Sequence, residues 1–189
     1  MLFRSVAIDR HSKATSFDSI AFPLVIKIPD GSFSRGMYKA ENRQQLEKYS
    51  TNMLKKSEIV LCQEFVESEF DWRIGILDKQ PLFAVQYFMA KGHWQIYNHQ
   101  SRSKAQKTGG HRTVPLHEVP PEVLEAAIKV ASLIGNSLYG VDLKQTKNGD
   151  VVVIEVNDNP NIDSGIEDAV VGNALYQKIL EHLVKMIEA

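Results

Sequence analysis

Short apolar runs and amphipathic stretches follow one another along the chain in mixed order, without a repeated unit. The apolar runs are bounded by turn residues and predict strands, at residues 22–28, 58–66, 72–77, 81–89, 94–98, 140–147 and 150–156. Apolar residues at helical spacing predict helices over 40–56, from Pro120-Pro121 onward and over 170–187. Residues 1–21 are weakly patterned, which fits a short helix, a linker or the end of a longer segment.

Turn residues join neighbouring strands at two places. Asp78-Lys79-Gln80 separates two predicted strands, and Asn148-Gly149 is a strong signal for a two-residue hairpin turn. Residues 99–113 are polar and basic and contain a Gly-Gly pair, which predicts a loop. Adjacent strands are thus linked as hairpins rather than through crossover helices, and the predicted fold class is α+β.

Composition narrows the classes of function. The chain has 189 residues with 22 basic and 23 acidic side chains and a formal net charge of −1, which argues against a dedicated nucleic-acid or membrane-surface binder. No apolar run approaches the roughly 20 residues of a membrane-spanning helix, and the N-terminus lacks the apolar segment of a secretion signal. Cys62 is the single cysteine and lies in an apolar run, so we expect a buried structural thiol in a cytoplasmic protein.

The last predicted hairpin carries a cluster of oxygen donors. Asp142 lies on its first strand, while Glu155 and Asn157 lie two apart on the second and therefore project from one face. Pairing around the Asn148-Gly149 turn would bring the three together, and such hard ligands suit Mg²⁺ or Mn²⁺. The alternative is the solvated face of an edge strand. Residues 151–154 are apolar throughout, which suggests a strand covered on both faces and favours the metal site.

A glycine-rich segment follows the strand at residues 22–28. Gly31 and Gly36 have the spacing of a phosphate-binding P-loop, but Met37 and Tyr38 stand where that motif needs Lys and Ser or Thr. A lysine within an apolar strand, Lys27, is costly unless it is paired, and it could supply the missing charge to a phosphate. The alternative is an edge-strand lysine that extends its ammonium group into water.

A third segment is an apolar strand that ends in polar groups. The run from Gln63 to Val66 could offer backbone donors and acceptors to a flat base, and a carboxylate shortly afterwards could accept bonds from ribose hydroxyls. Taken alone this pattern is common.

The three segments, in this order, resemble the ATP-grasp domain of the RimK-like carboxylate–amine ligases. The resemblance runs from about residue 22 to the C-terminus. It rests on Val25-Ile26-Lys27, Gly31-Ser32-x-Ser34-x-Gly36, Gln63-Glu64-Phe65-Val66, Asp71-x-Arg73, Gly140-Val141-Asp142, and Glu155-Val156-Asn157 with Asn159-Pro160. Each motif alone is weak, whereas the ordered set is specific.

The resemblance implies two α+β subdomains that hold ATP between antiparallel sheets: residues 22–66 with the glycine-rich lid and residues 67–189 with the metal site, after an N-terminal segment or linker at 1–21. It implies that Lys27 and the lid contact the ATP phosphates, and that Arg73 points toward the transferred phosphate or the acyl phosphate. The remaining implied ATP contacts are Ser32, Ser34, Arg35, Gly36, Gln63, Glu64, Phe65 and Val66, with Asp71 on the ribose and Ile154 on the base. Asp142, Glu155 and Asn157 would hold Mg²⁺ or Mn²⁺.

The implied reaction transfers the γ-phosphoryl group of ATP to a substrate carboxylate, and an amine of an amino acid or peptide then displaces phosphate from the acyl phosphate. A lid that excludes water fits this chemistry. ATP-grasp ligases normally carry an additional N-terminal domain, so the chain is expected either to be part of a longer enzyme or to borrow the missing part. The sequence leaves the oligomeric state open.

Residues 93–113 depart from the family pattern. Asn98 can be matched, and Asn98, Arg112 and Asn159 are candidate substrate contacts. One hypothesis is that the basic side chains of residues 99–113 (Arg102, Lys104, Lys107 and Arg112) recognise an acidic substrate, and a solvated loop is the alternative. Two other functions stay open: a nucleotide-binding module without ligase activity, and a metalloprotein unrelated to ATP, which would leave Lys27 and the glycine-rich loop unexplained.

Overall fold

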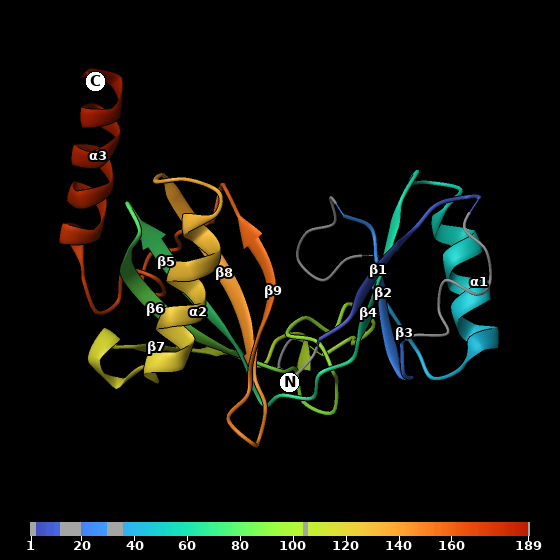
Figure 1. The fold of residues 1–189 in the computed structure, drawn as a ribbon. Helices are drawn as coiled ribbons and strands as arrows, with labels where there is room; N and C mark the ends of the chain where they lie inside the picture. Colours follow the sequence, from blue (N-terminus) through green and yellow to red (C-terminus); the bar gives the residue numbers. More distant parts are fainter. Residues whose placement is uncertain (1–2, 12–19, 30–35, 104–105, 189) are drawn as a thin grey trace. The chain divides into compact units, whose positions relative to one another are not determined.

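The chain divides into two compact units in the computed structural model, which describes residues 3–11, 20–29, 36–103 and 106–188 (Figure 1). The first unit is Met1–Glu67 and the second is Ser68–Ala189. Each unit has its own antiparallel sheet and at least one buried apolar cluster. The predicted α+β class is therefore confirmed.

The first unit contains a four-stranded sheet in the order β1-β4-β2-β3. Its strands are β1 (Ser5–Ile8), β2 (Leu24–Lys27), β3 (Tyr38–Ala40) and β4 (Val60–Glu64), and all neighbours are antiparallel. Strand β1 lies in residues 1–21, where the sequence predicted a short helix, a linker or the end of a longer segment; at Ser5–Ile8 the helix and the linker are wrong. Four residues are too few for a periodic signal, and β1 is stabilised by pairing with a distant strand, β4.

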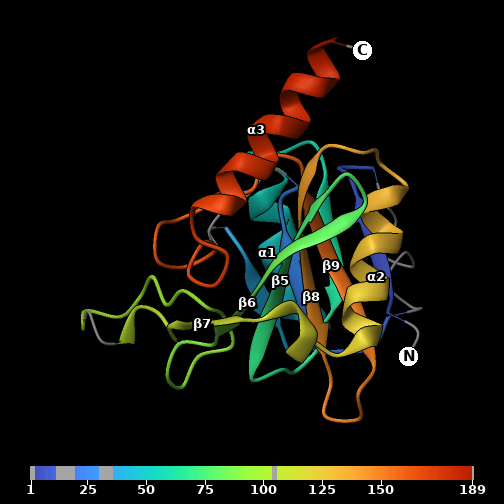
Figure 2. The same cartoon turned by 90° about the vertical axis from the view of Figure 1, so that its left-hand side faces the viewer.

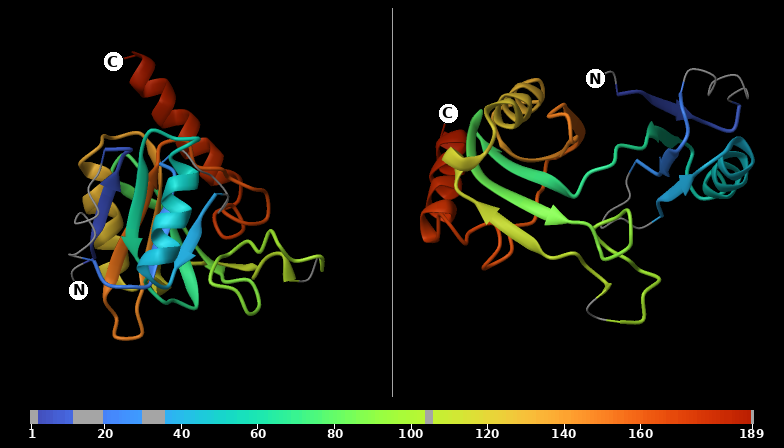
Figure 3. Two further views of the ribbon diagram at one scale, coloured as in Figure 1. Left: turned by 90° about the vertical axis from the view of Figure 1, so that its right-hand side faces the viewer. Right: turned by 90° about the horizontal axis from the view of Figure 1, so that it is seen from below.

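Helix α1 (Arg43–Met53) packs on one face of this sheet (Figure 3, left). The side chain of Asn42 caps it by accepting a hydrogen bond from the Gln45 backbone N–H at 3.0 Å. Leu46 and Met53 of the helix are buried against apolar residues of the strands, including Ile26. The alternation along β2 thus sends one set of side chains into this core and leaves the other set on the opposite face.

Cys62 is fully buried in this core, as the sequence predicted. Burial raises the pKa of its thiol from 9.0 to about 12. A raised pKa in the folded protein adds stability that is fully present below pH 9 and is lost as the pH rises toward 12. The thiol should therefore contribute to alkaline destabilisation of the first unit.

We expect the free energy of unfolding of the first unit to fall between pH 7 and pH 10 by about 1.4 kcal/mol more in the wild-type chain than in Cys62→Ala, because only the wild-type unfolded state gains a thiolate. Urea unfolding at the two pH values, followed by a probe in the first unit, measures this difference. An equal pH dependence in both proteins would show that Cys62 does not titrate in this way.

The second unit contains a five-stranded antiparallel sheet in the order β7-β6-β5-β8-β9. Its strands are β5 (Phe70–Leu77), β6 (Gln80–Phe88), β7 (His111–Val114), β8 (Leu138–Gln145) and β9 (Val151–Asn157). Residues 94–98 were predicted to form a strand but do not: in the described part of the chain, Tyr97 forms an isolated bridge with Thr108 and no ladder continues from it. Conversely, the end of the predicted loop 99–113 belongs to β7, which pairs with β6.

The two faces of this sheet are covered differently. Helix α2 (Pro121–Ser132), which follows the short helix η3 (Leu116–Glu118), buries Val123, Ala127 and Ala131 against one face. Helix α3 (Asn173–Glu188) begins three residues later than predicted, after a run of turns, and buries Leu175 in a second apolar cluster that includes Phe83. Figure 2 shows α3 continuing past the sheet toward the C-terminus. None of the helices in the described ranges is both long and apolar enough to span a membrane.

Candidate functional site

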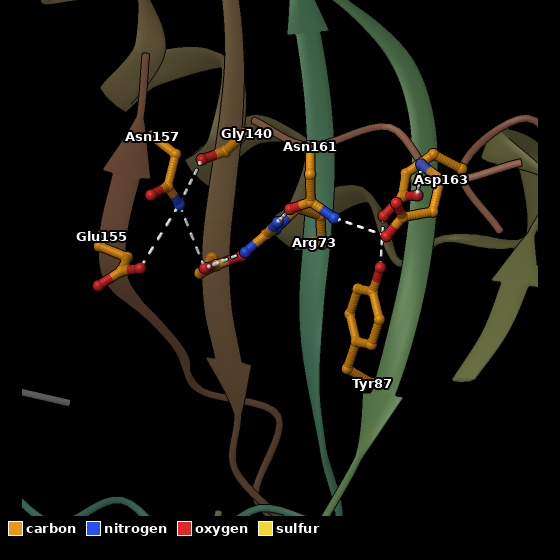
Figure 4. A network of polar contacts seen from close by, with 9 residues as sticks. Arg73, Tyr87, Gly140, Glu155, Asn157, Asn161 and Asp163 are labelled. Carbon is orange, nitrogen blue, oxygen red and sulfur yellow. Dashed lines mark hydrogen bonds and ion pairs between the residues drawn. The ribbon is translucent and has the colours of Figure 1, made fainter. Parts of the chain in front are cut away.

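A row of polar side chains crosses the second sheet on the face opposite α2. Strand β5 contributes Arg73, β8 contributes Asp142, and β9 contributes Glu155 and Asn157. Arg73 is paired in register with Asp142, which in turn is paired with Glu155. The core-facing residues of the same strands, such as Val141, pack under α2. Three strands therefore place the predicted metal ligands and the predicted catalytic arginine side by side (Figure 4).

A β-bulge sets the register of β9. Val153 pairs with Leu143 and Glu155 pairs with Asp142, so Ile154 is an extra residue without a partner on β8. The β8–β9 loop also differs from the prediction: Thr146 N–H donates to Asp150 O at 2.9 Å, which closes three residues rather than a two-residue turn. The longer loop shifts the pairing of β9 with β8 by one residue, which would place Ile154 opposite Asp142. The bulge at Ile154 cancels this shift, so Glu155 lies opposite Asp142.

Arg73 and Asp142 form a two-bonded ion pair. Arg73 Nε donates to Asp142 Oδ1 at 2.6 Å and Nη2 donates to Oδ2 at 2.8 Å, while Nη1 donates to Asn161 Oδ1 at 3.1 Å. Both side chains of the pair are mostly buried, with 18% exposed. Burial raises the pKa of Asp142 and Arg73 opposes this rise. Burial lowers the pKa of Arg73, but the hydrogen bonds and charge of Asp142 outweigh it and raise that pKa overall.

The donor set beside this pair fits a hard divalent cation. Asn157 Nδ2 lies 3.3 Å from Asp142 Oδ2 and 3.5 Å from Glu155 Oε1. Half a turn of the amide would present Asn157 Oδ1 in place of the nitrogen, so that three oxygens face one point. Each carboxylate oxygen of Asp142 has a second lone pair beyond the one used by Arg73. Within the described ranges, no group of three or more His, Cys, Asp or Glu side chains could hold a metal, so the amide is needed.

Gly140 makes room for the chain that follows β9. A Cβ atom at this position would lie 2.7 Å from Cβ of Pro160 and 3.4 Å from Cδ of Arg73. The segment after Asn157 can therefore fold back over β8, where Asn161 reaches Arg73. Asn161, which the sequence reasoning left without a role, thus contacts Arg73, whereas Asn159 is exposed.

Asp71 forms an ion pair within the second unit that was not predicted from the sequence. Lys144 Nζ donates to Asp71 Oδ1 at 2.5 Å, and Ser68 Oγ donates to the same oxygen at 3.1 Å. Lys144 lies two residues after Asp142 on β8 and is paired in register with Asp71. The alternation of β8 could have predicted that Lys144 shares a face with Asp142. It could not have predicted the pair with Asp71, which lies 73 residues away in the sequence.

A buried acid, Glu167, was also missed. It is fully buried and accepts hydrogen bonds from the Tyr87 hydroxyl and from the Asp163 backbone N–H, the latter at 2.8 Å. Asn161 Nδ2 donates to Asp163 Oδ2 at 2.8 Å and so connects this group to Arg73 (Figure 4). The run of polar residues after β9 was the only available signal, and it did not indicate which of them turn inward.

The predicted nucleotide contacts before residue 68 belong to the first unit. Lys27 is buried at the end of β2, which lies between β3 and β4, so the edge-strand alternative for this residue is wrong. The backbone N–H groups of Glu64 and Phe65 donate to Arg4 O at 3.1 Å and Pro23 O at 3.0 Å. Gln63 Nε2 donates to Ser5 Oγ at 3.1 Å.

Part of the predicted lid lies outside the described residues, namely Gly31, Ser32, Ser34 and Arg35. Gly36, at its end, has a φ of 66°, a conformation that favours glycine. The β2–β3 pairing shows that the lid connects two antiparallel strands.

The candidate substrate residues of the β6–β7 connection have local partners. Asn98 N–H donates to Lys107 O at 2.8 Å, and Asn98 Oδ1 accepts from the Gln100 N–H at 3.1 Å, so this residue organises a turn. Arg112 Nη2 lies 3.4 Å from Glu118 Oε2, and both side chains are exposed. Figure 3 (right) shows the connection reaching beyond the ends of β6 and β7. Lys104 lies outside the described residues.

Comparison with known proteins assigns the family. The model of the RimK-like ATP-grasp domain matches residues 5–183. The chain is 30% identical to a probable alpha-L-glutamate ligase of Vibrio atlanticus, over 86% of this chain and 50% of that protein. It is 28% identical to a D-alanine–D-alanine ligase of Aquifex aeolicus, over 75% of this chain and 47% of the relative. The chain thus spans about half the length of these relatives.

Solved structures agree on the fold. A D-alanine–D-alanine ligase from Bacillus anthracis aligns with a TM-score of 0.73 at 18% identity, over 97% of this chain and 62% of that one. The same enzyme complexed with ATP aligns with a TM-score of 0.71 at 15% identity, over 97% of this chain and 59% of that one. These similarities, together with the family match over most of the sequence, show that the chain belongs to the RimK-like ATP-grasp domain family.

Proposed function

We propose that the protein is an ATP- and Mg²⁺-dependent ligase that joins a carboxylate to an amine of an amino acid or peptide through an acyl phosphate. The observation that carries this proposal is the alignment of Arg73, Asp142, Glu155 and Asn157 on one face of the second sheet. This set combines a fixed cation with three hard oxygen donors, which is what phosphoryl transfer requires. The relatives named as ligases support the same reaction class.

Arg73 is prepared to bind an anion. Of its five N–H groups, three donate to Asp142 and Asn161 within the described part of the unit, which leaves two for a ligand. Because the pair with Asp142 already holds the guanidinium, little further ordering is needed when a phosphate arrives. We infer that these two groups contact the transferred phosphoryl group and then the acyl phosphate.

The other nucleotide contacts follow the motifs. Lys27 and the lid residues would bind the phosphates, Asp71 the ribose, and Ile154 one side of the base. The N–H groups of Glu64 and Phe65 already donate hydrogen bonds to carbonyl groups of the first unit. We therefore infer that the Val66 N–H is the backbone donor to adenine. Asp71 Oδ1 is occupied by Lys144 and Ser68, which directs Oδ2 toward a ribose hydroxyl.

The proposed reaction has two successive substitution steps, joined by the acyl phosphate. A carboxylate oxygen of the substrate attacks the γ-phosphorus, and the bond to the β–γ bridging oxygen breaks to release ADP. A neutral amine next attacks the acyl carbon, phosphate leaves with the electron pair, and the amine loses one proton as the amide forms. Bound Mg²⁺ would neutralise phosphate charge. Arg73 and Lys27 would each bind phosphoryl oxygens, and the lid would exclude water that could hydrolyse the acyl phosphate.

One alternative function is supported by a specific observation. The chain spans about half the length of its curated relatives, so it could bind ATP while another domain supplies part of the substrate site. In that case the chain binds Mg·ATP but releases no ADP with any carboxylate and amine. Adding a separate substrate-binding domain should then yield activity.

Mg·ATP should raise the melting temperature, because a ligand present at 100 times its Kd stabilises the native state by about 2.7 kcal/mol. Differential scanning fluorimetry with Mg·ATP, ATP with EDTA, and Mg²⁺ alone separates nucleotide from metal effects. A screen of amino acid pairs and acidic peptides for ADP release then tests ligation. No thermal shift at millimolar Mg·ATP would contradict the nucleotide assignment.

A further inference from the structure

Five residues of the second unit form a closed ring of contacts that extends beyond the family motifs. Arg73 donates to Asn161, Asn161 donates to Asp163, the Asp163 backbone donates to Glu167, and the Tyr87 hydroxyl donates to Glu167. The ring closes because the Arg73 guanidinium carbon lies 5.9 Å from the centroid of the Tyr87 ring. We call this set the Glu167 ring (Figure 4).

Glu167 is the least expected member of the ring. It is fully buried, and taking a carboxylate out of water costs several kcal/mol unless hydrogen bonds replace the solvent. Its two oxygens accept from two elements that are distant in the sequence, the end of β6 and the loop after β9. Apolar contacts could link these two elements without the cost of burying an acid. A purely structural role therefore does not explain why the link uses Glu167.

The Tyr87 hydroxyl is protonated and so can donate its hydrogen bond to Glu167. Burial and the bond to Glu167 raise the pKa of this hydroxyl further above the neutral range, where the group is a hydrogen-bond donor. The Tyr87 ring is then fixed beside Arg73, where the aromatic face attracts the guanidinium. Asn161 meanwhile holds Nη1 from the loop side. The guanidinium is therefore contacted by Asp142, Asn161 and Tyr87.

We propose that Glu167 and Tyr87 are positioning residues that fix the orientation of Arg73 through this ring. The consequence for catalysis rests on the proposed function, in which Arg73 binds the transferred phosphate. An arginine has about 2 kcal/mol of side-chain rotamer entropy to lose, and the ring removes that freedom before the ligand arrives. Neither Glu167 nor Tyr87 needs to contact a substrate for this role.

The test measures Arg73 directly and needs no enzymatic activity. The Nε–H resonance of Arg73 is identified in ¹H–¹⁵N NMR spectra by its loss in Arg73→Lys, and its exchange with water is measured. In Tyr87→Phe and Glu167→Gln we expect this exchange to become at least about tenfold faster, because side-chain contacts that limit opening are lost. Tyr176→Phe is the matched control, since it removes a tyrosine hydroxyl that donates to Asp168 at 2.9 Å outside the ring.

The outcome for Tyr87→Phe decides the proposal even if Glu167→Gln fails to fold, because only one hydroxyl is removed. Unchanged Arg73 exchange in Tyr87→Phe, or equal acceleration in Tyr176→Phe, overturns it. ADP release is measured separately: if the wild-type protein is active, Tyr87→Phe should lower kcat by about tenfold or more and leave the KM for ATP within twofold. Absence of wild-type turnover together with faster Arg73 exchange would instead contradict the proposed function and leave the ring supported.

Discussion

Replacing Asp142 with alanine is expected to lower the free energy of unfolding of the second unit by about 3–5 kcal/mol. The substitution removes both acceptors of the pair with Arg73, whose side chain is only 18% exposed. Without its carboxylate, a guanidinium at that depth retains most of the desolvation cost, and only the hydrogen bond to Asn161 and the contact with Tyr87 remain to offset it. Urea unfolding followed by a probe in the second unit measures the change.

Two comparisons isolate the cause. In the double variant Arg73→Met/Asp142→Leu no charge remains, so most of the lost stability should return. Glu118→Ala breaks an exposed pair with Arg112 in the same unit and should cost less than about 1 kcal/mol. If Asp142→Ala costs no more than Glu118→Ala, the pair does not carry the energy we assign to it.

The same reasoning shows that an Asp142 variant is a poor probe of metal binding. Loss of activity in Asp142→Ala would be confounded by loss of stability, because Asp142 is both the partner of Arg73 and a predicted ligand. Glu155 is the better probe, since β9 proves to be an edge strand, as in the alternative that the sequence left open, and the Glu155 side chain is exposed. A conservative change there removes a carboxylate without leaving a buried charge unpaired.

Glu155→Gln is expected to lose most of the stabilisation by Mg·ATP while its melting temperature without ligand stays close to that of the wild-type chain. Replacement of residues that only support metal ligands typically weakens metal binding 10- to 100-fold, and removal of a ligand charge should weaken it at least as much. Titration with Mn²⁺ in the presence of ATP, followed by electron paramagnetic resonance, measures the metal affinity directly. ADP release, where present, should fall in parallel.

A charge-matched control is available three residues further on. Asp158→Asn removes the same charge from an exposed side chain just beyond the end of β9. If Glu155 acts as a ligand, Asp158→Asn should retain most of the Mn²⁺ affinity. If both variants lose affinity equally, the effect is one of general electrostatics rather than of coordination.

The arrangement of motifs and the main elements could be predicted because they depend on local patterns. Helix α2 begins at Pro121, within the predicted Pro120-Pro121 start, and Lys27 was singled out because a lysine among apolar strand residues is costly. Strand β1 and the missing strand at 94–98 were not predictable in this way. A strand needs a partner, and whether four residues find one is decided by contacts distant in the sequence.

The polar network around Arg73 shows the same limit at the level of side chains. Asp71 and Arg73 were identified from their motif, whereas Lys144, Tyr87 and Glu167 were not. Each of the missed residues acts through a partner more than 70 positions away in the sequence. A buried glutamate in particular has no local signature, since the sequence around it reads as a polar loop.

The sequence by itself determined the residue types of the candidate metal site and showed that Glu155 and Asn157 share a face. Only the tertiary structure decided which face that is. Alternation continued from Val151 and Val153, which pack under α2, would direct Glu155 into the same core. The extra residue Ile154 resets that alternation and compensates for a loop one residue longer than predicted, so Glu155 meets Asp142. Register depends on hydrogen bonds between β8 and β9, and no single strand encodes it.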